Sequence, residues 1–223
     1  MICKKIRDSI RDIKFGKDES GKNKYLNAED VFFPLSVFYR FEISVERDFL
    51  EEQLEIEVDK INELIKLSEI TQTEEARRDQ MLSLIHSSIA ESYFKTYQVY
   101  PVLGKRIKKE ILQKDEDLEY CLFHKYITSS DPRNALEVVN HLGGYWFYNK
   151  REGKTLLKKL VEDKEIEKSI KKGIKKEEDI ERVVSCVRNI ADVSEEVALK
   201  LVNAVSARIE KEEDVEKIGS FVR

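Results

Sequence analysis

The sequence predicts an all-α protein in which an N-terminal helical domain is followed by a short, α-solenoid-like array of antiparallel helix pairs. Charged residues make up 38% of the 223 residues, while the chain holds only eight glycines and three prolines. This composition is typical of helices joined by short turns. In addition, residues 174–188 recur as residues 209–223. A fixed period of this length indicates stacked supersecondary units.

The two copies of this 35-residue repeat agree at nine of fifteen positions. In the first copy, Ile180, Val183 and Val187 recur at helical spacing, and the acidic run 177–179 precedes them in the position that favours a helix start. Ser194 is the expected N-cap of a second helix with its own apolar stripe. One unit is therefore helix, turn, helix. A weaker echo at 114–119 leaves open whether a third copy exists.

The N-terminal domain is expected to span residues 1–104 and the repeat region residues 105–223, with the junction near Pro101 and Gly104. Apolar spacing predicts helices over 2–13, over 54–65 and from Thr73 onward. The helix from Thr73 carries the stripe Leu82, Ile85, Ile89 and Tyr93.

Residues 31–45 are ambiguous between helix and strand. Leu35, Phe38 and Phe41 fit a helix, which we favour, whereas the residues from 37 to 45 alternate as a strand would. A strand here would need a partner, and residues 97–102 offer the only credible one. Pro101 would restrict that pairing to a sheet edge.

Helix starts in the second half are clearer. Asp131 before Pro132 is a strong N-terminal signal. The helix that follows has the apolar stripe Ala135, Val138, Val139 and Leu142.

An aromatic and basic segment at 145–176 is a candidate nucleic-acid site. Bases stack on aromatic faces, while lysine and arginine bind phosphates. Residues 149–176 hold eleven basic residues against five acids, whereas residues 42–59 hold eight acids against one arginine. The alternative is purely structural: the aromatic residues pack in a helix interface, and the lysines form an ordinary solvated helix face. The candidate residues are Tyr145, Trp146, Tyr148, Lys150, Arg151, Lys164, Lys168, Lys171, Lys172 and Lys175.

A metal site is a weaker hypothesis. Cys121 and His124 have the spacing of half a zinc site, and His141 could approach them across a helix pair. A buried thiol beside a partly exposed imidazole explains the same residues more simply.

The sequence gives no evidence of catalysis or of a bound cofactor. No Ser-centred elbow, Glu-x-x-His pair or Gly-rich dinucleotide turn is present, so the chain does not read as an enzyme. Helical arrays present extended binding surfaces. The favoured function is a scaffold or adaptor that binds another protein or its own copy, and nucleic-acid binding through 145–176 is the alternative.

The N-terminus lacks the apolar core of a signal peptide, and no run is long enough to span a membrane. We therefore expect a cytoplasmic protein with reduced thiols, and the Lys/Glu-rich composition also suits a thermophile. The second copy of the repeat ends after one helix. The sequence leaves open whether Arg223 ends a piece of a longer array or whether an oligomer partner covers this end.

Overall fold

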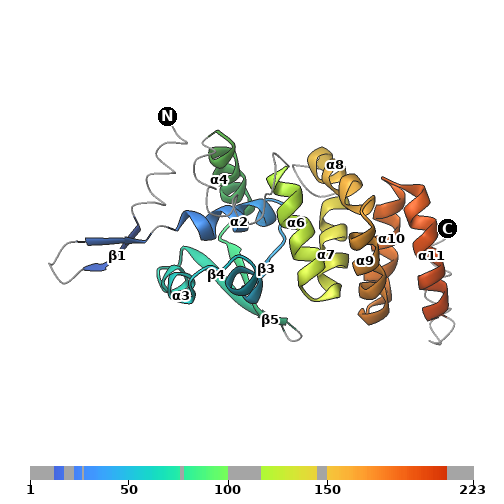
Figure 1. Cartoon of the computed structure of the whole chain (residues 1–223), viewed down its shortest axis with the longest axis horizontal. Coiled ribbons are helices and arrows are strands. Elements are labelled where there is room, and N and C mark those ends of the chain that lie inside the picture. Colours follow the sequence, from blue (N-terminus) through green and yellow to red (C-terminus); the bar gives the residue numbers. More distant parts are fainter. Residues whose placement is uncertain are drawn as a thin grey trace. The chain divides into compact units, whose positions relative to one another are not determined.

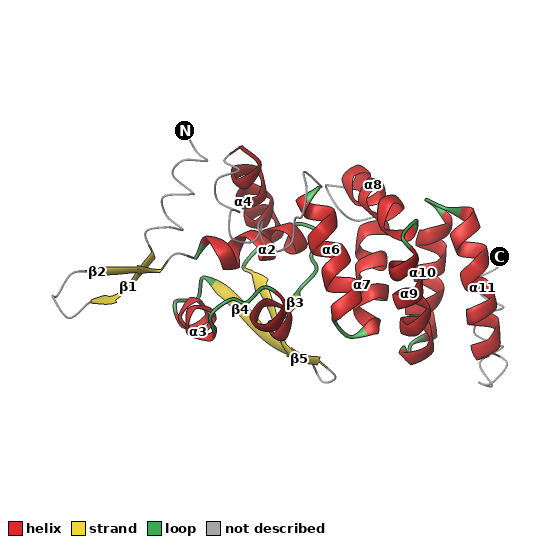
Figure 2. Ribbon diagram, viewed as in Figure 1, coloured by secondary structure: helices red, strands yellow, loops and turns green. Residues whose placement is uncertain are grey.

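The computed structural model describes residues 13–17, 23–26, 28–75, 78–99, 117–144 and 150–209. The chain forms two compact units, Met1–Phe123 and His124–Arg223. The described part is mostly helical, as the sequence predicts, but it also contains short strands (Figures 1 and 2). The predicted junction at 104/105 and the second repeat copy after residue 209 lie outside the described residues.

The N-terminal unit combines helices with two small antiparallel sheets. Strands β1 and β2 form the first, and β3, β4 and β5 form the second in the order β3-β5-β4. The elements are β1 (Ile13–Lys17), β2 (Asn23–Leu26), α2 (Glu29–Tyr39), β3 (Val45–Glu46), the short π-helix η1 (Phe49–Gln53), α3 (Val58–Lys66), β4 (Ile70–Glu75), β5 (Arg78–Leu84), α4 (Ser87–Val99) and the start of α6 (Leu118–Ser129).

From α2 to β5, helices alternate in the sequence with the three strands of the second sheet. A helix is followed by a strand, two helices and a β-hairpin, and β5 pairs with both β3 and β4. Val45 lies opposite Leu82, and Ile70 lies opposite Leu84. Helix α3 and the short π-helix η1 thus lie, in the sequence, between β3 and the hairpin with which β3 pairs.

The predicted helix from Thr73 is wrong in its first half. Residues 70–75 and 78–84 form the β4–β5 hairpin, and the helix α4 begins only at Ser87. Residues 81–84 are all buried, as in a strand covered on both faces, while Ile85 and Ile89 are exposed. The apparent helical stripe therefore crosses a strand-to-helix junction. The first predicted helix is also wrong at its end, because Ile13 begins β1.

Helix is confirmed for most of the ambiguous segment 31–45, since α2 runs to Tyr39. Every residue from Val31 to Phe38 is buried, which explains why no single period dominates the sequence there. Only Val45 and Glu46 form a strand, and they pair with β5. The strand alternative named 97–102 as its partner, but residues 97–99 belong to α4 and residues 100–102 lie outside the described residues.

A buried arginine joins three helices of this unit. The Arg40 side chain, just after α2, is 2% exposed and ion-pairs with Glu91 of α4 and Glu119 of α6. Its guanidinium also lies over the rings of Phe41 and Phe94, at 4.4 and 3.8 Å from their centroids. Stacking on aromatic faces and bonding to carboxylates compensate the cost of removing this charge from water.

Replacing Arg40 by Met should destabilise the protein by about 3–5 kcal/mol, because removing one member of a buried ion pair leaves the other charge uncompensated. Urea denaturation followed by circular dichroism measures the loss. Lys66→Met is the control, since Lys66 pairs with Glu63 at 3.5 Å with its side chain 74% exposed. That change should cost no more than about 1 kcal/mol. Equal effects of both changes would contradict the structural role of Arg40.

The described residues of the C-terminal unit form helices and the turns between them, and none of the described helices in either unit is long and apolar enough to cross a membrane. Asp131, as the sequence predicts, caps α7 by accepting a hydrogen bond from the backbone N–H of Arg133, and the predicted stripe of α7 is buried. Asp163 and Asp179 cap α9 and α10 in the same way. The helices are the end of α6, then α7 (Pro132–Gly143), α8 (Lys150–Val161), α9 (Lys164–Lys176), α10 (Ile180–Ala191) and α11 (Glu195–Ile209).

Helix α7 is the centre of this unit and packs against α8, α9 and α10. Two glycines permit the close approach. A Cβ atom on Gly173 of α9 would lie 2.4 Å from the carbonyl oxygen of Pro132, and one on Gly143 of α7 would lie 2.5 Å from Cβ of Asn189 in α10. Both distances are shorter than any van der Waals contact, so α7 and its neighbours pack at these points only because a side chain is missing.

Gly173→Ala should destabilise the C-terminal unit by about 1–3 kcal/mol, because the added methyl group meets backbone and the helices must move apart. Chemical denaturation measures the change, with Ser169→Ala on the same helix as the control. In an open helix the glycine substitution would instead stabilise by up to about 1 kcal/mol. A gain in stability would therefore contradict the close packing of α9 on α7.

Candidate functional site

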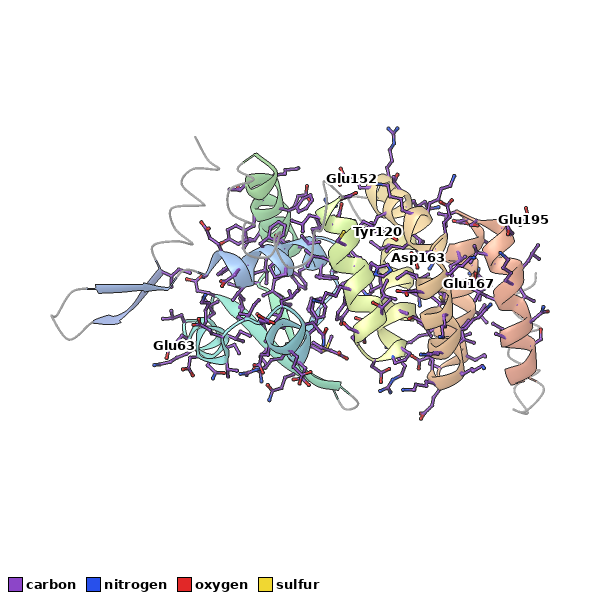
Figure 3. The ribbon with its side chains drawn as sticks, in the orientation of Figure 1. Glu63, Tyr120, Glu152, Asp163, Glu167 and Glu195 are labelled. Atoms are coloured by element: carbon purple, nitrogen blue, oxygen red, sulfur yellow. The ribbon has the colours of Figure 1, made fainter. Side chains whose placement is uncertain are left out.

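The outer side of α9 carries a row of exposed lysines, which we call the lysine face: Lys164, Lys168, Lys172 and Lys175. The opposite side of the helix buries Ile166, Ile170 and Ile174. Because 3.6 residues make one turn, the spacing of the lysines places all four on one side of the helix. Figure 3 labels Asp163 and Glu167 near the beginning of α9.

The lysine face is not neutralised within the described residues, where no carboxylate lies within 4.0 Å of any of its four ammonium groups. Lys171, at the margin, differs because its Nζ lies 2.5 Å from Oε1 of Glu167. Lys176 also differs, since its charge acts on Asp131 at the start of α7. The four exposed ammonium groups are therefore free to bind anions.

Comparison of α9 with α7 shows that the lysine face occupies positions that α7 uses for packing. Helix α7 begins at Pro132 and α9 at Lys164, 32 residues later. At this offset Lys168 corresponds to Leu136, which is 1% exposed, and Lys175 corresponds to Gly143, which contacts α10. A further helix could not pack on α9 in the same way without burying lysine ammonium groups.

The structure brings together part of the predicted nucleic-acid site. Lys164, Lys168, Lys172 and Lys175 lie on the lysine face, Lys171 lies half-buried at its margin, and Arg151 is exposed on α8. Lys150 begins α8, but its side chain is not described. Tyr145, Trp146 and Tyr148 lie outside the described residues. The proposed combination of aromatic and basic groups therefore stays a prediction.

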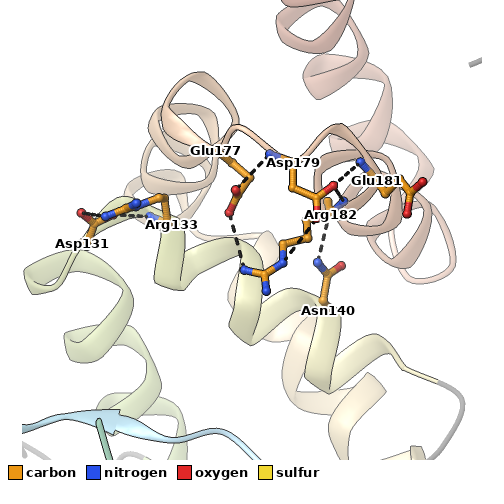
Figure 4. A network of polar contacts seen from close by, with 7 residues as sticks. All are labelled: Asp131, Arg133, Asn140, Glu177, Asp179, Glu181 and Arg182. Carbon is orange, nitrogen blue, oxygen red and sulfur yellow. Dashed lines mark hydrogen bonds and ion pairs between the residues drawn. The ribbon is translucent and has the colours of Figure 1, made fainter. Parts of the chain in front are cut away.

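A polar network holds the turn between α9 and α10 (Figure 4). The Glu177 side chain is 6% exposed, and its Oε1 accepts a hydrogen bond from the backbone N–H of Asp179 at 3.1 Å. Asp179 in turn accepts from the backbone N–H groups of Glu181 and Arg182. Oε2 of Glu177 lies 4.0 Å from Nη1 of Arg182. These bonds satisfy the otherwise unpaired N–H groups at the start of α10.

The same network reaches α7. Nδ2 of Asn140 donates to the carbonyl oxygen of Arg182 at 3.1 Å, and Nδ2 of Asn189 donates to Oδ1 of Asn140 at 3.1 Å. The sequence analysis missed these contacts. Their signal was the identity of the acidic turn in both repeat copies, because a turn that caps a helix constrains its residues by geometry. The network has a structural explanation and does not require a ligand.

Asp131 forms a two-point pair with Arg133 at the start of α7. Its Oδ1 lies 3.1 Å from Nε and its Oδ2 lies 3.2 Å from Nη2. Burial raises the pKa of the Asp131 carboxyl. Hydrogen bonds from the side chain and backbone of Arg133, with the charges of Arg133 and Lys176, outweigh that effect and leave the pKa below its usual value.

Stability should therefore fall in acid partly through Asp131. A carboxyl whose pKa is lowered by folding stabilises the protein above its unfolded pKa of about 3.9, and this contribution is lost as the pH falls through the folded value. Asp131→Asn keeps a good N-cap and should make the decline in urea midpoint below about pH 4 shallower. Asp59→Asn, which removes an exposed carboxylate of the other unit, is the control. An unchanged acid decline in Asp131→Asn would contradict this role.

The residues of the metal hypothesis do not converge on a site. Nε2 of His124 lies 3.6 Å from Oδ1 of Asp163 and 3.7 Å from Oε2 of Glu165, which places the imidazole beside the start of α9. Cys121 and His141 are each half-buried. Among the described residues, no three His, Cys, Asp or Glu side chains gather in a way that could hold a metal ion. We therefore build no metal site on Cys121, His124 and His141.

Helix α3 of the N-terminal unit has the wrong charge for binding nucleic acid. Contacts of lysine and arginine with phosphates supply much of the affinity of proteins for nucleic acid. In α3, Lys60 is bound to Asp30 and Lys66 to Glu63, while Asp59 is exposed. The segment 42–59 that leads into α3 is strongly acidic. The charges on and before α3 therefore do not favour binding of nucleic acid at this helix.

Comparisons of the chain with protein-family models, with curated proteins and with solved structures each returned no significant match.

Proposed function

We propose that this protein is a helical-repeat scaffold that binds a partner protein through the lysine face of α9 and carries out no chemistry of its own. The spacing of its helices supports an α-solenoid-like array. Helices α7, α9 and α11 begin at residues 132, 164 and 195, and α6, α8 and α10 begin at residues 118, 150 and 180. Both series advance by 30–32 residues, a period typical of stacked helix pairs.

The observation that carries the proposal is that Lys168 and Lys175 of α9 are exposed, whereas the corresponding Leu136 and Gly143 of α7 are buried. Helix α7 packs against α8, α9 and α10, and α9 packs against α7, α8 and α11 but leaves its lysine face exposed. The face extends over about 16 Å from Lys164 to Lys175, at a rise of about 1.5 Å per residue. That length matches one face of a helix or strand of a partner.

Charge favours a partner protein with an acidic surface. Glu165 and Glu167 border the lysine face, and the whole chain has a formal net charge of −4. The molecule as a whole therefore repels a long polyanion, while a local patch of matched carboxylates can still be recognised. A second copy of the chain belongs to this class of partner, because residues 42–59 are acidic.

Nucleic-acid binding is the second candidate, and the exposure of the four lysines favours it. Each lysine that neutralises a phosphate releases counterions, so binding would weaken steeply with salt. The predicted aromatic residues Tyr145, Trp146 and Tyr148 would add stacking to this contact. The two proposed functions differ in the class of the partner, which is a protein in the first and a nucleic acid in the second.

The test compares the full-length protein with Lys168→Gln/Lys172→Gln, which removes two charges from the lysine face. Proteins retained from an extract of the source cells are identified, and binding of labelled single- and double-stranded nucleic acid is titrated at about 50 and 200 mM salt. We expect a retained protein whose binding falls at least about tenfold in the variant, since each buried interfacial charge contact contributes on the order of 1.4 kcal/mol or more.

The control variant is Lys66→Gln/Lys95→Gln, which removes two exposed charges from the other unit. It should retain the partner at full strength. Tight, salt-sensitive nucleic-acid binding that is lost only in the α9 variant would favour the second candidate. If both variants bind as strongly as the unchanged protein, the lysine face is not the binding surface.

A further inference from the structure

The N-terminal unit has a charged surface of opposite sign to the lysine face. It consists of four exposed carboxylates in η1, in the turn after it and at the start of α3, which we call the acidic surface: Glu52, Glu55, Glu57 and Asp59. Among the described residues, no basic side chain lies within 4.0 Å of any of these four carboxylates. The acidic surface is therefore available to a cationic partner.

The backbone at Glu55 does not favour glutamate. Its φ is 52°, which lies in the left-handed region. Residues with a side chain rarely adopt this conformation, and asparagine tolerates it better than glutamate does. Residues held in such sparsely populated conformations cluster at functional sites.

Glu57 is also a poor choice for the local structure. It is the N-cap of α3, yet its side chain makes no capping hydrogen bond. Serine, threonine, aspartate and asparagine are the residues that stabilise this position. Two positions of the acidic surface thus carry glutamate although another residue would suit the backbone better, and proteins break such local rules mainly at functional sites. The two carboxylates are therefore candidates for the recognition of a partner.

The acidic surface matches the lysine face of α9 in charge and in length. Each surface has four exposed charges. The lysine face extends over about 16 Å, and the eight residues that hold the acidic surface span at most about 24 Å even when fully extended. Val58, between two of the carboxylates, is 47% exposed, and the apolar stem of a lysine can cover it while the ammonium group reaches a carboxylate.

We propose that the partner of the lysine face is a second copy of this chain, bound through its acidic surface. This inference rests on the proposed function, because it names the partner of the same face. Both surfaces are exposed in the single chain, so another molecule can reach each of them. The formal net charge of −4 opposes the approach of two copies only weakly, since salt screens exposed charges more than about 8 Å apart under physiological conditions.

This contact joins two different surfaces, so it does not close with two copies. A copy that is bound through its lysine face still presents its acidic surface, and the reverse is also true. Such head-to-tail contacts build rings or open chains and not symmetric dimers. The assembly should also weaken as the salt concentration rises, because pairs of exposed charges hold it together.

The test is sedimentation velocity of the 223-residue chain at several protein concentrations, at about 50 and 200 mM salt. Lys168→Gln/Lys172→Gln removes two charges from the lysine face, and Glu55→Asn/Glu57→Ser removes two from the acidic surface. Because asparagine tolerates the φ of residue 55 and serine can cap α3, the second variant should be no less stable in urea than the unchanged protein. We expect the unchanged protein to assemble beyond a dimer and each variant alone to associate at least about tenfold more weakly.

An equimolar mixture of the two variants gives the sharper result. One intact lysine face then meets one intact acidic surface, and the neutralised surfaces bind no third copy. We expect this mixture to form a dimer and nothing larger. Glu162→Gln/Glu195→Gln, which removes two exposed carboxylates from the C-terminal unit, is the matched control and should assemble as the unchanged protein does.

The outcomes that overturn this inference differ from those that overturn the proposed function. A monomer that still retains another protein, which Lys168→Gln/Lys172→Gln releases, would reject the second copy and leave the proposed function standing. Assembly that this variant abolishes but Glu55→Asn/Glu57→Ser leaves intact would reject the acidic surface alone. A monomer that retains no protein through the lysine face would overturn both. A lower urea midpoint in Glu55→Asn/Glu57→Ser would contradict the argument that glutamate is unfavourable for the local structure.

Discussion

The close packing of neighbouring helices on α7 is the constraint on which the C-terminal unit depends. At Gly173 the backbone of α9 approaches the Pro132 carbonyl, and at Gly143 α7 itself approaches Asn189 of α10. Helices that approach so closely exchange a large area of apolar contact, and they lock in a single register because any shift meets a side chain. The hydrogen bonds between Asn140, Asn189 and the Arg182 carbonyl fix the same register by polar contacts.

This register determines which surfaces are left for function. Within the described part of the unit, α7 packs against α8, α9 and α10, while α9 keeps its lysine face exposed and α11 keeps Leu199 and Val202 exposed. At the fifth residue of each helix, Leu136 of α7 is buried, whereas Lys168 of α9 and Leu199 of α11 are exposed. Helices that begin 31 or 32 residues apart therefore differ in which of their residues are exposed.

The N-terminal unit is held together by an aromatic core and a buried arginine. Its core is aromatic, with Phe38 4.5 Å from Phe123 and 6.1 Å from Phe49, centroid to centroid. At the edge of this core Arg40 joins α2, α4 and α6 through two carboxylates and two aromatic rings. A buried cation with several partners specifies how these helices meet, although apolar residues of the same size could provide comparable stability.

Sequence by itself determined those features that local chemistry controls. The helix start at Asp131, the stripe of α7 and the mostly helical character followed from capping preferences and apolar periodicity. Only the tertiary structure decided that residues 70–84 form a hairpin, that Val45 pairs with Leu82, and that the lysine face is uncovered while the matching face of α7 is packed. The physical reason is that strand pairing, glycine contacts and exposure depend on residues distant in sequence, and a single chain read locally contains no information about which of them meet.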